Sequence, residues 1–353
     1  MIDDLRFEAF LIKRKSVFRI ATGASDVEDN VIVRLGSDGE FGVGSASPSD
    51  VTHETKDTIT DFLRAARQRV TGVDESDLSA LHESLDSVAR GNTAAKAAVD
   101  MAAYDLLAKR ADKRVFELLG GAGDGSMLTD ITIGIEDREE TVKRAVAHCA
   151  EGFRALKLKV GLNLSEDIER MTAVRDAIGP CVEMRVDANQ GYSVDEASRF
   201  CEEMHTLGVV LVEQPVDADD YEGLRKVRER SPVPIMADEC LRTVDDARKV
   251  AEMGAADIIN IKLMKSGGIH PAVEIDEIAK DAGMTTMVGC MGEIQLSIAA
   301  GLHFALGSGN VRYVDLDSHF SMIDDPSTGL TFKDGALGVA PRPGLGVATD
   351  LDQ

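Results

Sequence analysis

The chain has 353 residues, which at about 150 residues per domain suggests two domains, or a barrel of about 250 residues with a smaller companion. Hydrophobic residues make up 44% and charged residues 29%, a mixture that excludes collagen-like and wholly disordered proteins. The formal net charge of −23 opposes binding to nucleic acids and anionic membranes, and no apolar run approaches the ~18 residues that span a bilayer. We therefore expect neither a nucleic-acid nor a membrane partner.

The acidic residues and the cysteines bear on the cellular setting. The chain has 37 Asp against 25 Glu, and 15 Lys against 24 Arg. This bias fits the solvated acidic surface of a halophile, and it equally fits an ordinary acidic protein. The five cysteines are widely spaced without a C-x-x-C pair, which indicates reduced thiols. The first ten residues carry three acids and no apolar signal region, so we expect a cytoplasmic protein.

The first 122 residues do not repeat and are expected to form an N-terminal α+β domain. Strands are predicted at Leu5–Ile12, Asn30–Leu35 and Phe41–Ser45, and these would pair as a small antiparallel sheet. A helix is predicted at Thr93–Ala111, because apolar residues recur there at helical spacing after a start signal at Asn92. The glycines from Gly120 to Gly123 then mark a boundary.

Residues 123–320 alternate between short apolar runs and helical stretches. The predicted strands are Leu128–Ile135, Ala155–Val160, Val182–Asp187, Val209–Glu213, Pro234–Asp238, Asp257–Lys262, Met284–Val288 and Arg312–Leu316. The predicted helices are Glu139–Glu151, Leu164–Ile178, Val194–Leu207, Tyr221–Arg230, Val244–Met253 and Pro271–Ala282. Eight such βα units predict a parallel (β/α)8 barrel. The Gly- and Pro-rich tail, residues 321–353, is expected to return to the N-terminal domain.

Ionisable residues end successive predicted strands at regular intervals. Asp187, Glu213 and Asp238 are followed by Lys262, at intervals of 26, 25 and 24 residues. The carboxyl ends of barrel strands share one face, where such enzymes place their chemistry. Three neighbouring carboxylates suit Mg²⁺, which prefers oxygen ligands, whereas no His- or Cys-rich cluster favours zinc. The alternative is that each acid caps the helix that follows it or pairs with a neighbouring base.

Lysines end the second and sixth strands of the predicted barrel. Lys157 and Lys159 are two residues apart, so both face the same side of their strand, and Lys262 lies on the diametrically opposed strand. A substrate carbon between the two strands would meet an amine on each side. We expect burial and clustered positive charge to lower the lysine pKa values towards working pH. The alternatives are that each lysine packs its side-chain stem at the barrel rim or acts as a counter-ion to the acids.

The chain resembles the enolase superfamily, in its muconate-lactonising-like subgroup, over nearly its whole length. The motifs that carry the resemblance are Lys157-Leu-Lys159, Asp187-Ala-Asn189-Gln, Glu213-Gln-Pro215, Ala237-Asp238-Glu239 and the run from Asn260 to Gly268. The stretch from Gly91 to Val99 and the pair Asp315-Leu-Asp317 are similar to the dipeptide epimerases, typified by L-Ala-D/L-Glu epimerase. The resemblance implies a modified, enolase-type barrel with a capping and specificity domain built from residues 1–122 and the tail.

The resemblance also implies roles for individual residues. Lys159 and Lys262 would be the two acid/base catalysts, Lys157 would support the enolate or the neighbouring base, and Asp187, Glu213 and Asp238 would bind one Mg²⁺ per subunit. Asp315 and Asp317 would bind the α-ammonium of a dipeptide. Thr132, Cys290, Met291 and Gly292 would line the substrate pocket, and Cys290 would be no nucleophile because no partner base is apparent.

The specificity residues depart from the pattern. In the L-Ala-D/L-Glu members an arginine just after the first strand contacts the distal carboxylate of the substrate, and Gly23 stands at that place here. Arg14 and Arg19 are out of register with it. We therefore expect no strict Glu specificity, and a small or apolar side chain at the epimerised residue fits better. His53 is expected to be a solvated loop residue.

The favoured function is an isomerase, a Mg²⁺-dependent epimerase of L,L-dipeptides. One lysine would take the α-proton of the C-terminal residue to give an enediolate, and the opposed lysine would return a proton from the other face. Alternatives on the same site are o-succinylbenzoate synthase, N-succinylamino acid racemase and muconate cycloisomerase. Schiff-base chemistry on Lys159 or Lys262 and a non-catalytic barrel are further alternatives. We expect a small-molecule substrate and a homo-oligomer.

Overall fold

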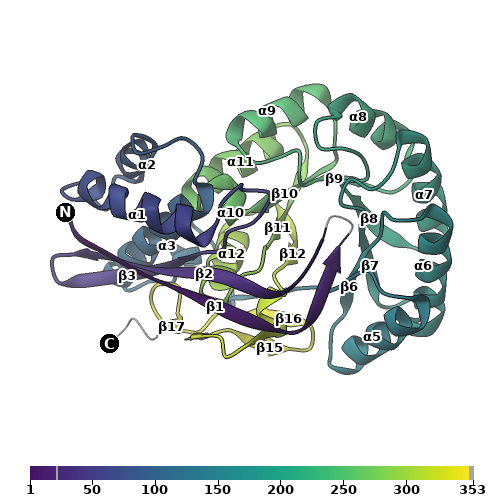
Figure 1. The fold of residues 1–353 in the computed structure, drawn as a ribbon, viewed down its shortest axis with the longest axis horizontal. Coiled ribbons are helices and arrows are strands. Elements are labelled where there is room, and N and C mark those ends of the chain that lie inside the picture. Colours follow the sequence, from purple (N-terminus) through teal and green to yellow (C-terminus); the bar gives the residue numbers. More distant parts are fainter. Residues whose placement is uncertain (21–22, 350–353) are drawn as a thin grey trace.

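The computed structural model describes residues 1–20 and 23–349. Figure 1 shows two parts, a barrel ringed by helices and a smaller α+β part that carries the N-terminus. A long two-stranded ribbon reaches from the smaller part across the front of the barrel. The division of the chain at residues 122 and 320 stays a prediction, because the C-terminal tail contributes strands to both parts.

The ribbon is formed by β1 (Ile2–Ile20) and β2 (Gly23–Ser37), which pair antiparallel, and β2 also pairs with β3 (Glu40–Ala46). The predicted strands are thus present, but β1 runs eight residues beyond Ile12. This extension was missed because Lys13, Arg14 and Lys15 directly follow Ile12 and end the alternating apolar pattern of a half-buried strand. The ribbon is what brings residues of the N-terminal part to the mouth of the barrel.

Four helices complete the N-terminal part: α1 (Lys56–Val70), α2 (Leu78–Asp86), α3 (Thr93–Arg110) and α4 (Val115–Leu118). The sheet packs on α3, whose residues are mostly buried. Gly42 and Gly44 of β3 make this contact possible, because a Cβ atom at either position would overlap the α3 backbone. The predicted helix start is confirmed, since α3 begins at Thr93 directly after Asn92, although Asn92 has a φ of 50° and its side chain makes no cap hydrogen bond.

The prediction of an eight-stranded parallel barrel is confirmed. Its strands are β5 (Ile131–Ile133), β6 (Ala155–Lys159), β7 (Glu183–Asp187), β8 (Val209–Glu213), β9 (Ile235–Ala237), β10 (Ile258–Lys262), β11 (Thr285–Gly289) and β12 (Val311–Asp315). Adjacent strands pair in parallel from β5 through β12. A parallel bridge between Thr129 and Val314 joins the first strand's leading residues to the last strand.

Helices connect the barrel strands and cover their outer side (Figure 1). They are α5 (Arg138–Ala150), α6 (Leu164–Ile178), α7 (Val194–Thr206), α8 (Tyr221–Arg230), α9 (Val244–Met253), α10 (Leu263–Ser266), α11 (Ile269–Asp281) and α12 (Gln295–Gly307). The six predicted helices are present within two residues of their predicted ends. Both α10 and α12 were missed.

The C-terminal tail contacts both parts of the molecule. After the short helix η1 (Ser318–Ser321), β13 (Met322–Ile323) pairs with β1 of the N-terminal part. The strand β16 (Ala336–Gly338) pairs with β15 (Thr331–Lys333) and with β4 (Ser126–Leu128), which precedes the barrel. Farther along, β14 (Ser327–Thr328) pairs with β17 (Ala348–Thr349). Among the residues that the structure describes, no helix has the length and apolar character needed to cross a membrane.

Candidate active site

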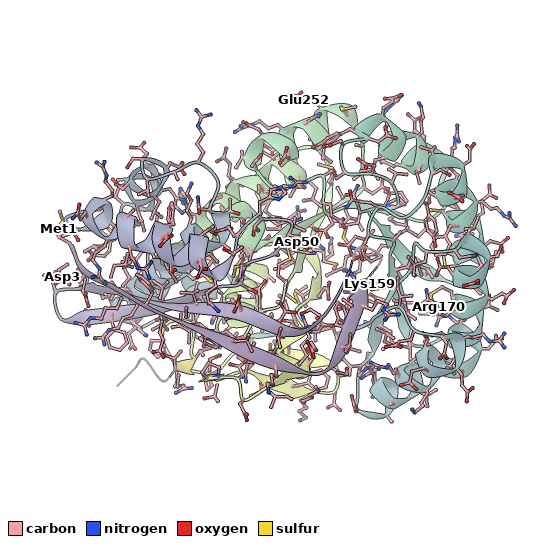
Figure 2. All side chains as sticks on the ribbon, viewed as in Figure 1. Met1, Asp3, Asp50, Lys159, Arg170 and Glu252 are labelled. Carbon is pink, nitrogen blue, oxygen red and sulfur yellow. The ribbon has the colours of Figure 1, made fainter. Side chains whose placement is uncertain are left out.

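A cavity of about 650 Å³ lies between the ribbon and the carboxyl ends of the barrel strands. Its wall includes residues from β1 and β2, the loop from Pro48 to His53, and residues in or directly after every barrel strand except β8. Figure 2 shows Lys159 on the inner side of the arc of barrel helices, whereas Glu252 lies at the outer edge. The barrel therefore supplies the floor of this cavity and the N-terminal part supplies its cover.

The three acids at successive strand ends gather into one cluster. Asp187, Glu213 and Asp238 are buried, and each offers a carboxylate oxygen within 4.8 Å of the others. This all-oxygen donor set suits a hard divalent cation such as Mg²⁺. The simple alternative, that each acid caps its own following helix, does not hold here, because Ser193, Asp220 and Thr243 cap the three helices concerned.

Neighbouring polar residues fix the orientation of these carboxylates. Asn260 of β10 donates from Nδ2 to Glu213 Oε1 at 2.6 Å, and the backbone N–H of Asn189 donates to Asp187 Oδ1 at 2.9 Å. The Gln214 side chain accepts from the backbone N–H of Asp238 at 3.0 Å. Asn189 and Gln214 both have positive φ angles, 40° and 32°, which cost energy in non-glycine residues. Two residues with a strained backbone thus lie beside the carboxylate cluster.

Four lysines surround the carboxylate cluster. Lys159 lies 2.6 Å from Asp187 and Lys262 lies 2.8 Å from Asp238, so the two opposed strands β6 and β10 each present an amine to the cluster. Lys157 is fully buried and contacts Asp187, Glu213 and Asp315 at 3.2, 2.5 and 2.7 Å. Lys265 of α10 holds Asp238 Oδ1 at 2.5 Å. Its role was not predicted, although it lies one helical turn after Lys262.

The expectation of lowered lysine pKa values is wrong for two of these lysines. Burial lowers the pKa of Lys262, but the carboxylates of Asp238 and Glu213 outweigh it and hold that pKa above its ordinary value. For Lys157, burial is likewise outweighed by Asp315, Glu213 and Asp187, which raise its pKa well above the ordinary value. Positive charge on Lys157 does oppose protonation of Lys262, but it is the smaller effect.

A second acidic cluster lies beside the first strand of the barrel. Asp315, Asp317 and Asp130 approach within 4.8 Å of one another. Asp315 contacts Lys157, whereas Asp317 accepts hydrogen bonds from the backbone N–H of Thr132 at 2.5 Å and, more weakly, from Cys290 Sγ at 3.7 Å. Burial and the charge of Asp315 raise the pKa of Asp317. Both Asp315 and Asp317 line the cavity, as does Thr132.

The loop after β11 also lines the cavity through Cys290, Met291 and Gly292. The carbonyl oxygen of Gly292 faces the N-terminal part, since it accepts from Asn30 Nδ2 at 3.0 Å and from Ser47 Oγ at 2.8 Å. Burial raises the pKa of the Cys290 thiol well above its ordinary value. A neutral thiol is a poor nucleophile, so the chemistry here favours a packing role for this side chain.

Three of the four residues weighed for substrate specificity lie at the cover of the cavity. Gly23, His53 and Arg14 all line it, and His53 is exposed. Arg14 is paired with Glu28 at 2.7 Å. Arg19 is exposed on the ribbon and does not line this cavity. Sequence reasoning missed Glu28 and also Arg242, a cation of the cavity wall that precedes α9.

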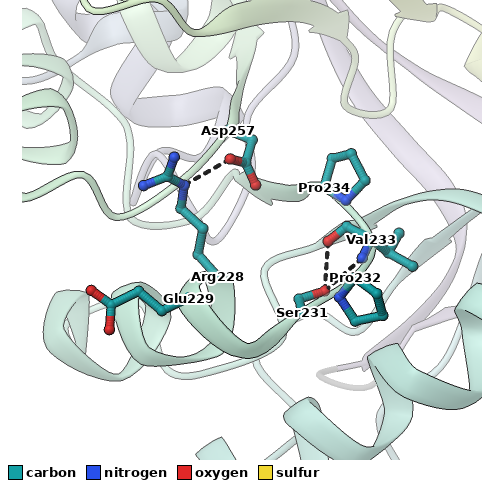
Figure 3. Close-up of a pocket in the computed structure, with 7 residues that line it drawn as sticks. All are labelled: Arg228, Glu229, Ser231, Pro232, Val233, Pro234 and Asp257. Carbon is teal, nitrogen blue, oxygen red and sulfur yellow. Dashed lines mark hydrogen bonds and ion pairs between the residues drawn. The ribbon is translucent and has the colours of Figure 1, made fainter.

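A second hollow, of about 450 Å³, lies at the opposite end of the barrel strands (Figure 3). It is lined by the loop from Ser231 to Pro234, before β9, and by the ion pair between Arg228 and Asp257 at 2.7 Å. Figure 3 shows that these groups bind each other: Ser231 Oγ bonds the backbone of Val233, and Arg228 bonds Asp257. In barrel enzymes this end contributes to stability rather than to chemistry.

The fold and the cavity define a barrel enzyme whose opposed lysines flank a carboxylate cluster. Residues 140–353 match the family model described as "Enolase C-terminal domain-like", and residues 6–120 match "Mandelate racemase / muconate lactonizing enzyme, N-terminal domain". The chain therefore belongs to the mandelate racemase and muconate lactonizing enzyme family of the enolase superfamily, as its motifs predicted.

Several characterised relatives are similar over nearly the whole chain. The hydrophobic dipeptide epimerase of Enterococcus faecalis is 37% identical, with 93% of each chain covered. The L-Ala-D/L-Glu epimerase of Clostridium acetobutylicum is also 37% identical, with 98% of each chain covered. The E. faecalis dipeptide epimerase, in a crystal structure with Mg and L-Leu-L-Tyr, superposes with a TM-score of 0.95 at 35% identity, covering 98% of this chain and 99% of that one.

Proposed function

We propose that this protein is a Mg²⁺-dependent dipeptide epimerase, an isomerase that inverts the α-carbon of the C-terminal residue of an L,L-dipeptide. The observation that carries the proposal is the placement of Lys159 and Lys262 on opposed strands of one cavity, with three buried carboxylates between them. The similarity to dipeptide epimerases over 93% and more of the chain supports it.

The residues of the site would have three roles: metal binding, proton transfer and charge stabilisation. Asp187, Glu213 and Asp238 would hold Mg²⁺, which when bound polarises a substrate carboxylate and so stabilises the charge left by proton removal. Lys159 and Lys262 would stand on opposite faces of the α-carbon, one to remove the proton and one to return it. Lys157 would keep its ammonium against Asp187, Glu213 and Asp315 and so add positive charge beneath the reacting centre.

Two acids would select a substrate with a free amino group. Asp317 and Asp315 line the cavity beside Thr132 and offer buried carboxylates to an ammonium ion. N-Succinyl amino acids and cyclohexene acids carry no such ammonium. This pair therefore favours dipeptides over the substrates of N-succinylamino acid racemase, o-succinylbenzoate synthase and muconate cycloisomerase.

Deuterium incorporation tests the proposal. Pooled L,L-dipeptides and N-succinyl amino acids are incubated with the protein in D₂O with Mg²⁺, at low and high salt, and followed by mass spectrometry. A mass gain of one unit in a subset of the dipeptides, lost with EDTA, is the expected result. Exchange confined to the N-succinyl compounds would assign the alternative reaction, and no exchange at either salt level would contradict both.

We propose further that the protein associates with copies of itself through the outer face of the ribbon. Lys13 of β1 lies opposite Val27 of β2 and Ile323 of β13, so these three side chains point to the same face of the sheet. Leu11 precedes Lys13 by two residues on β1 and therefore lies on that face as well. Leu11, Val27 and Ile323 are 52%, 38% and 40% exposed. Clustered apolar residues of this kind are typical of interfaces.

Sedimentation velocity tests this association. The wild type should sediment as an oligomer and the variant Leu11→Glu should shift to a smaller species, whereas Val146→Glu on the outer side of α5 should not. A monomeric wild type would contradict the proposal.

We also propose that the protein works in a reducing compartment such as the cytoplasm. The five free cysteines support this proposal, and cell fractionation would test it.

A further inference from the structure

A mostly buried ion pair lies in the part of the cavity wall that β1 and β2 form. Arg14 and Glu28 both line the cavity, and Arg14 Nε lies 2.7 Å from Glu28 Oε1. Their side chains are 8% and 19% exposed. Water therefore screens this pair much less than a surface ion pair, and its partners attract each other correspondingly more strongly.

The other groups around Arg14 also belong to the protein. Its Nη1 donates to Ser321 Oγ at 2.8 Å, and its guanidinium lies 5.0 Å from the centre of the Phe18 ring. Three segments, β1, β2 and η1, thus hold one arginine in place. Its Nε–H and one N–H of Nη1 therefore already have partners within the protein.

Glu28 is fixed from the barrel side by Gly292. A Cβ atom at position 292 would overlap the Glu28 carboxylate, so the absence of a side chain there gives this carboxylate its place. Gly292 was predicted to line the pocket, and the structure shows that it also leaves room for the Glu28 carboxylate. Glu28 therefore sits between the ribbon and the loop after β11, with its charge at the cavity wall and directed to Arg14.

This arrangement disfavours an acidic side chain near the wall. A substrate carboxylate there would meet an arginine that is already bound and would lie close to the negative charge of Glu28. An uncharged side chain would neither need a free arginine nor be repelled by Glu28, and it could pack against Phe18 and Met291, which line the same wall. Relatives named for hydrophobic and for L-Ala-D/L-Glu substrates are equally identical to this chain, so overall identity does not decide between them.

We infer that Glu28 sets the charge preference of the cavity by occupying Arg14, so that the enzyme prefers dipeptides with an uncharged side chain over those with an acidic one. The inference rests on the proposed dipeptide epimerase activity. It follows that removing the charge of Glu28 would release Arg14 to bind a substrate carboxylate in a two-pronged hydrogen bond.

The experiment compares amide and acid dipeptides of the same shape. Values of kcat/KM for deuterium exchange are measured for L-Ala-L-Gln against L-Ala-L-Glu, and for L-Gln-L-Ala against L-Glu-L-Ala. In one of these two pairs the variable side chain faces Arg14, and for that pair the wild type should have a kcat/KM about tenfold or more higher for the amide than for the acid. In the Glu28→Gln variant the ratio of kcat/KM for the acid to kcat/KM for the amide should rise at least tenfold for the same pair.

Two further variants separate this effect from general damage. Arg14→Met combined with Glu28→Gln should cancel the gain, because the released arginine is gone. Glu40→Gln breaks an exposed Arg110–Glu40 bond outside the cavity and should leave the ratio unchanged. Circular dichroism checks that each variant is folded.

Unchanged ratios in a folded Glu28→Gln variant would overturn the inference. If that variant does not fold, the wild type decides, because equal kcat/KM for acid and amide in both pairs would overturn it as well. A wild type that exchanges no dipeptide at all would overturn the proposed function, and this inference with it. The two failures are therefore distinguishable by whether the amide dipeptides exchange.

Discussion

Asp317 differs from its neighbour Asp315 in what already binds it. Asp315 is held at 2.7 Å by the ammonium of Lys157, whereas the described contacts of Asp317 are the Thr132 backbone N–H, the Cys290 thiol and the carboxylates beside it. A substrate ammonium would therefore gain most from Asp317, since no cation of the protein contacts it among the residues described.

Replacing Asp317 should lower kcat/KM selectively for dipeptides, which carry a free amino group. For Asp317→Asn we expect kcat/KM for dipeptides to fall by roughly 10- to 100-fold, because a charge-assisted hydrogen bond is worth about 1.5–3 kcal/mol. Any slow turnover of an N-succinyl amino acid, which lacks the ammonium, should not fall in parallel. Steady-state kinetics on both substrate classes checks this, and an equal loss on both would point to structural damage instead.

The charges in the cavity also explain one failure of sequence reasoning. From the sequence, clustered lysines were expected to lower each other's pKa values. The structure places carboxylates within 2.8 Å of Lys157 and Lys262, and their attraction outweighs burial and, for Lys262, repulsion from Lys157, so both pKa values are raised. Strand spacing predicts which residues share a barrel end, but it does not predict which charges touch.

At the scale of elements, α3 receives its N-terminal cap from a distant residue. The Glu54 carboxylate accepts from the backbone N–H groups of Ala94 and Ala95, at 2.9 and 3.2 Å. A negative charge at a helix N-terminus is favourable, both through these hydrogen bonds and through the helix dipole. Glu54 precedes α1, so this contact also ties the cavity loop that ends at His53 to the most buried helix of the N-terminal part.

Removing this cap should destabilise the protein measurably. For Glu54→Ala we expect a loss of about 1–2 kcal/mol in the free energy of unfolding, the usual cost of a lost N-cap. Glu203→Ala, at an exposed position of α7, should change it by less than about 0.5 kcal/mol. Urea denaturation of the two variants compares them, and equal stabilities would show that Glu54 adds nothing as a cap.

The helix α12 was missed for a physical reason. The helix α12 is apolar and buried around nearly its whole circumference, from Leu296 to Ala305, so it lacks the one-sided pattern that reveals an amphipathic helix. The half-exposed helices α6, α8 and α9 have that pattern and were predicted with their observed ends. Likewise the Arg14–Glu28 pair spans two strands whose register was not evident from the sequence.

At the scale of the whole molecule, His303 joins three regions of the chain. His303 lies in α12 of the barrel. Its Nδ1 accepts a hydrogen bond from the backbone N–H of Phe116 in α4, and its Nε2 donates one to the carbonyl oxygen of Leu345 in the tail, each at 3.2 Å. These two bonds require a neutral ring with the proton on Nε2. Burial lowers the pKa of His303 to about 4.

Acid should therefore loosen this junction. In the unfolded chain the pKa of a histidine is near 6.5, so between about pH 6.5 and 4 the unfolded state binds a proton that the folded state does not. The contribution of His303 to stability is thus complete above pH 6.5 and is lost as the pH falls towards 4, by ~3 kcal/mol in total.

The variant His303→Gln, which does not titrate, isolates this contribution. Measured by urea denaturation, the wild type should lose about 3 kcal/mol relative to His303→Gln between pH 7 and pH 4. His205→Gln, at an exposed position of α7, provides the matched control and should follow the wild type. Parallel pH profiles for wild type and His303→Gln would contradict a buried neutral His303.

The central claim is that two lysines act on opposite faces of one α-carbon, and single-lysine variants in D₂O test it most directly. Proton NMR and chiral chromatography follow an L,L-dipeptide that the wild type inverts. Neither Lys159→Ala nor Lys262→Ala should form the inverted product. The variant that keeps the lysine facing the α-proton should still exchange it for deuterium with retention of configuration. Inversion by either variant would contradict the two-base account.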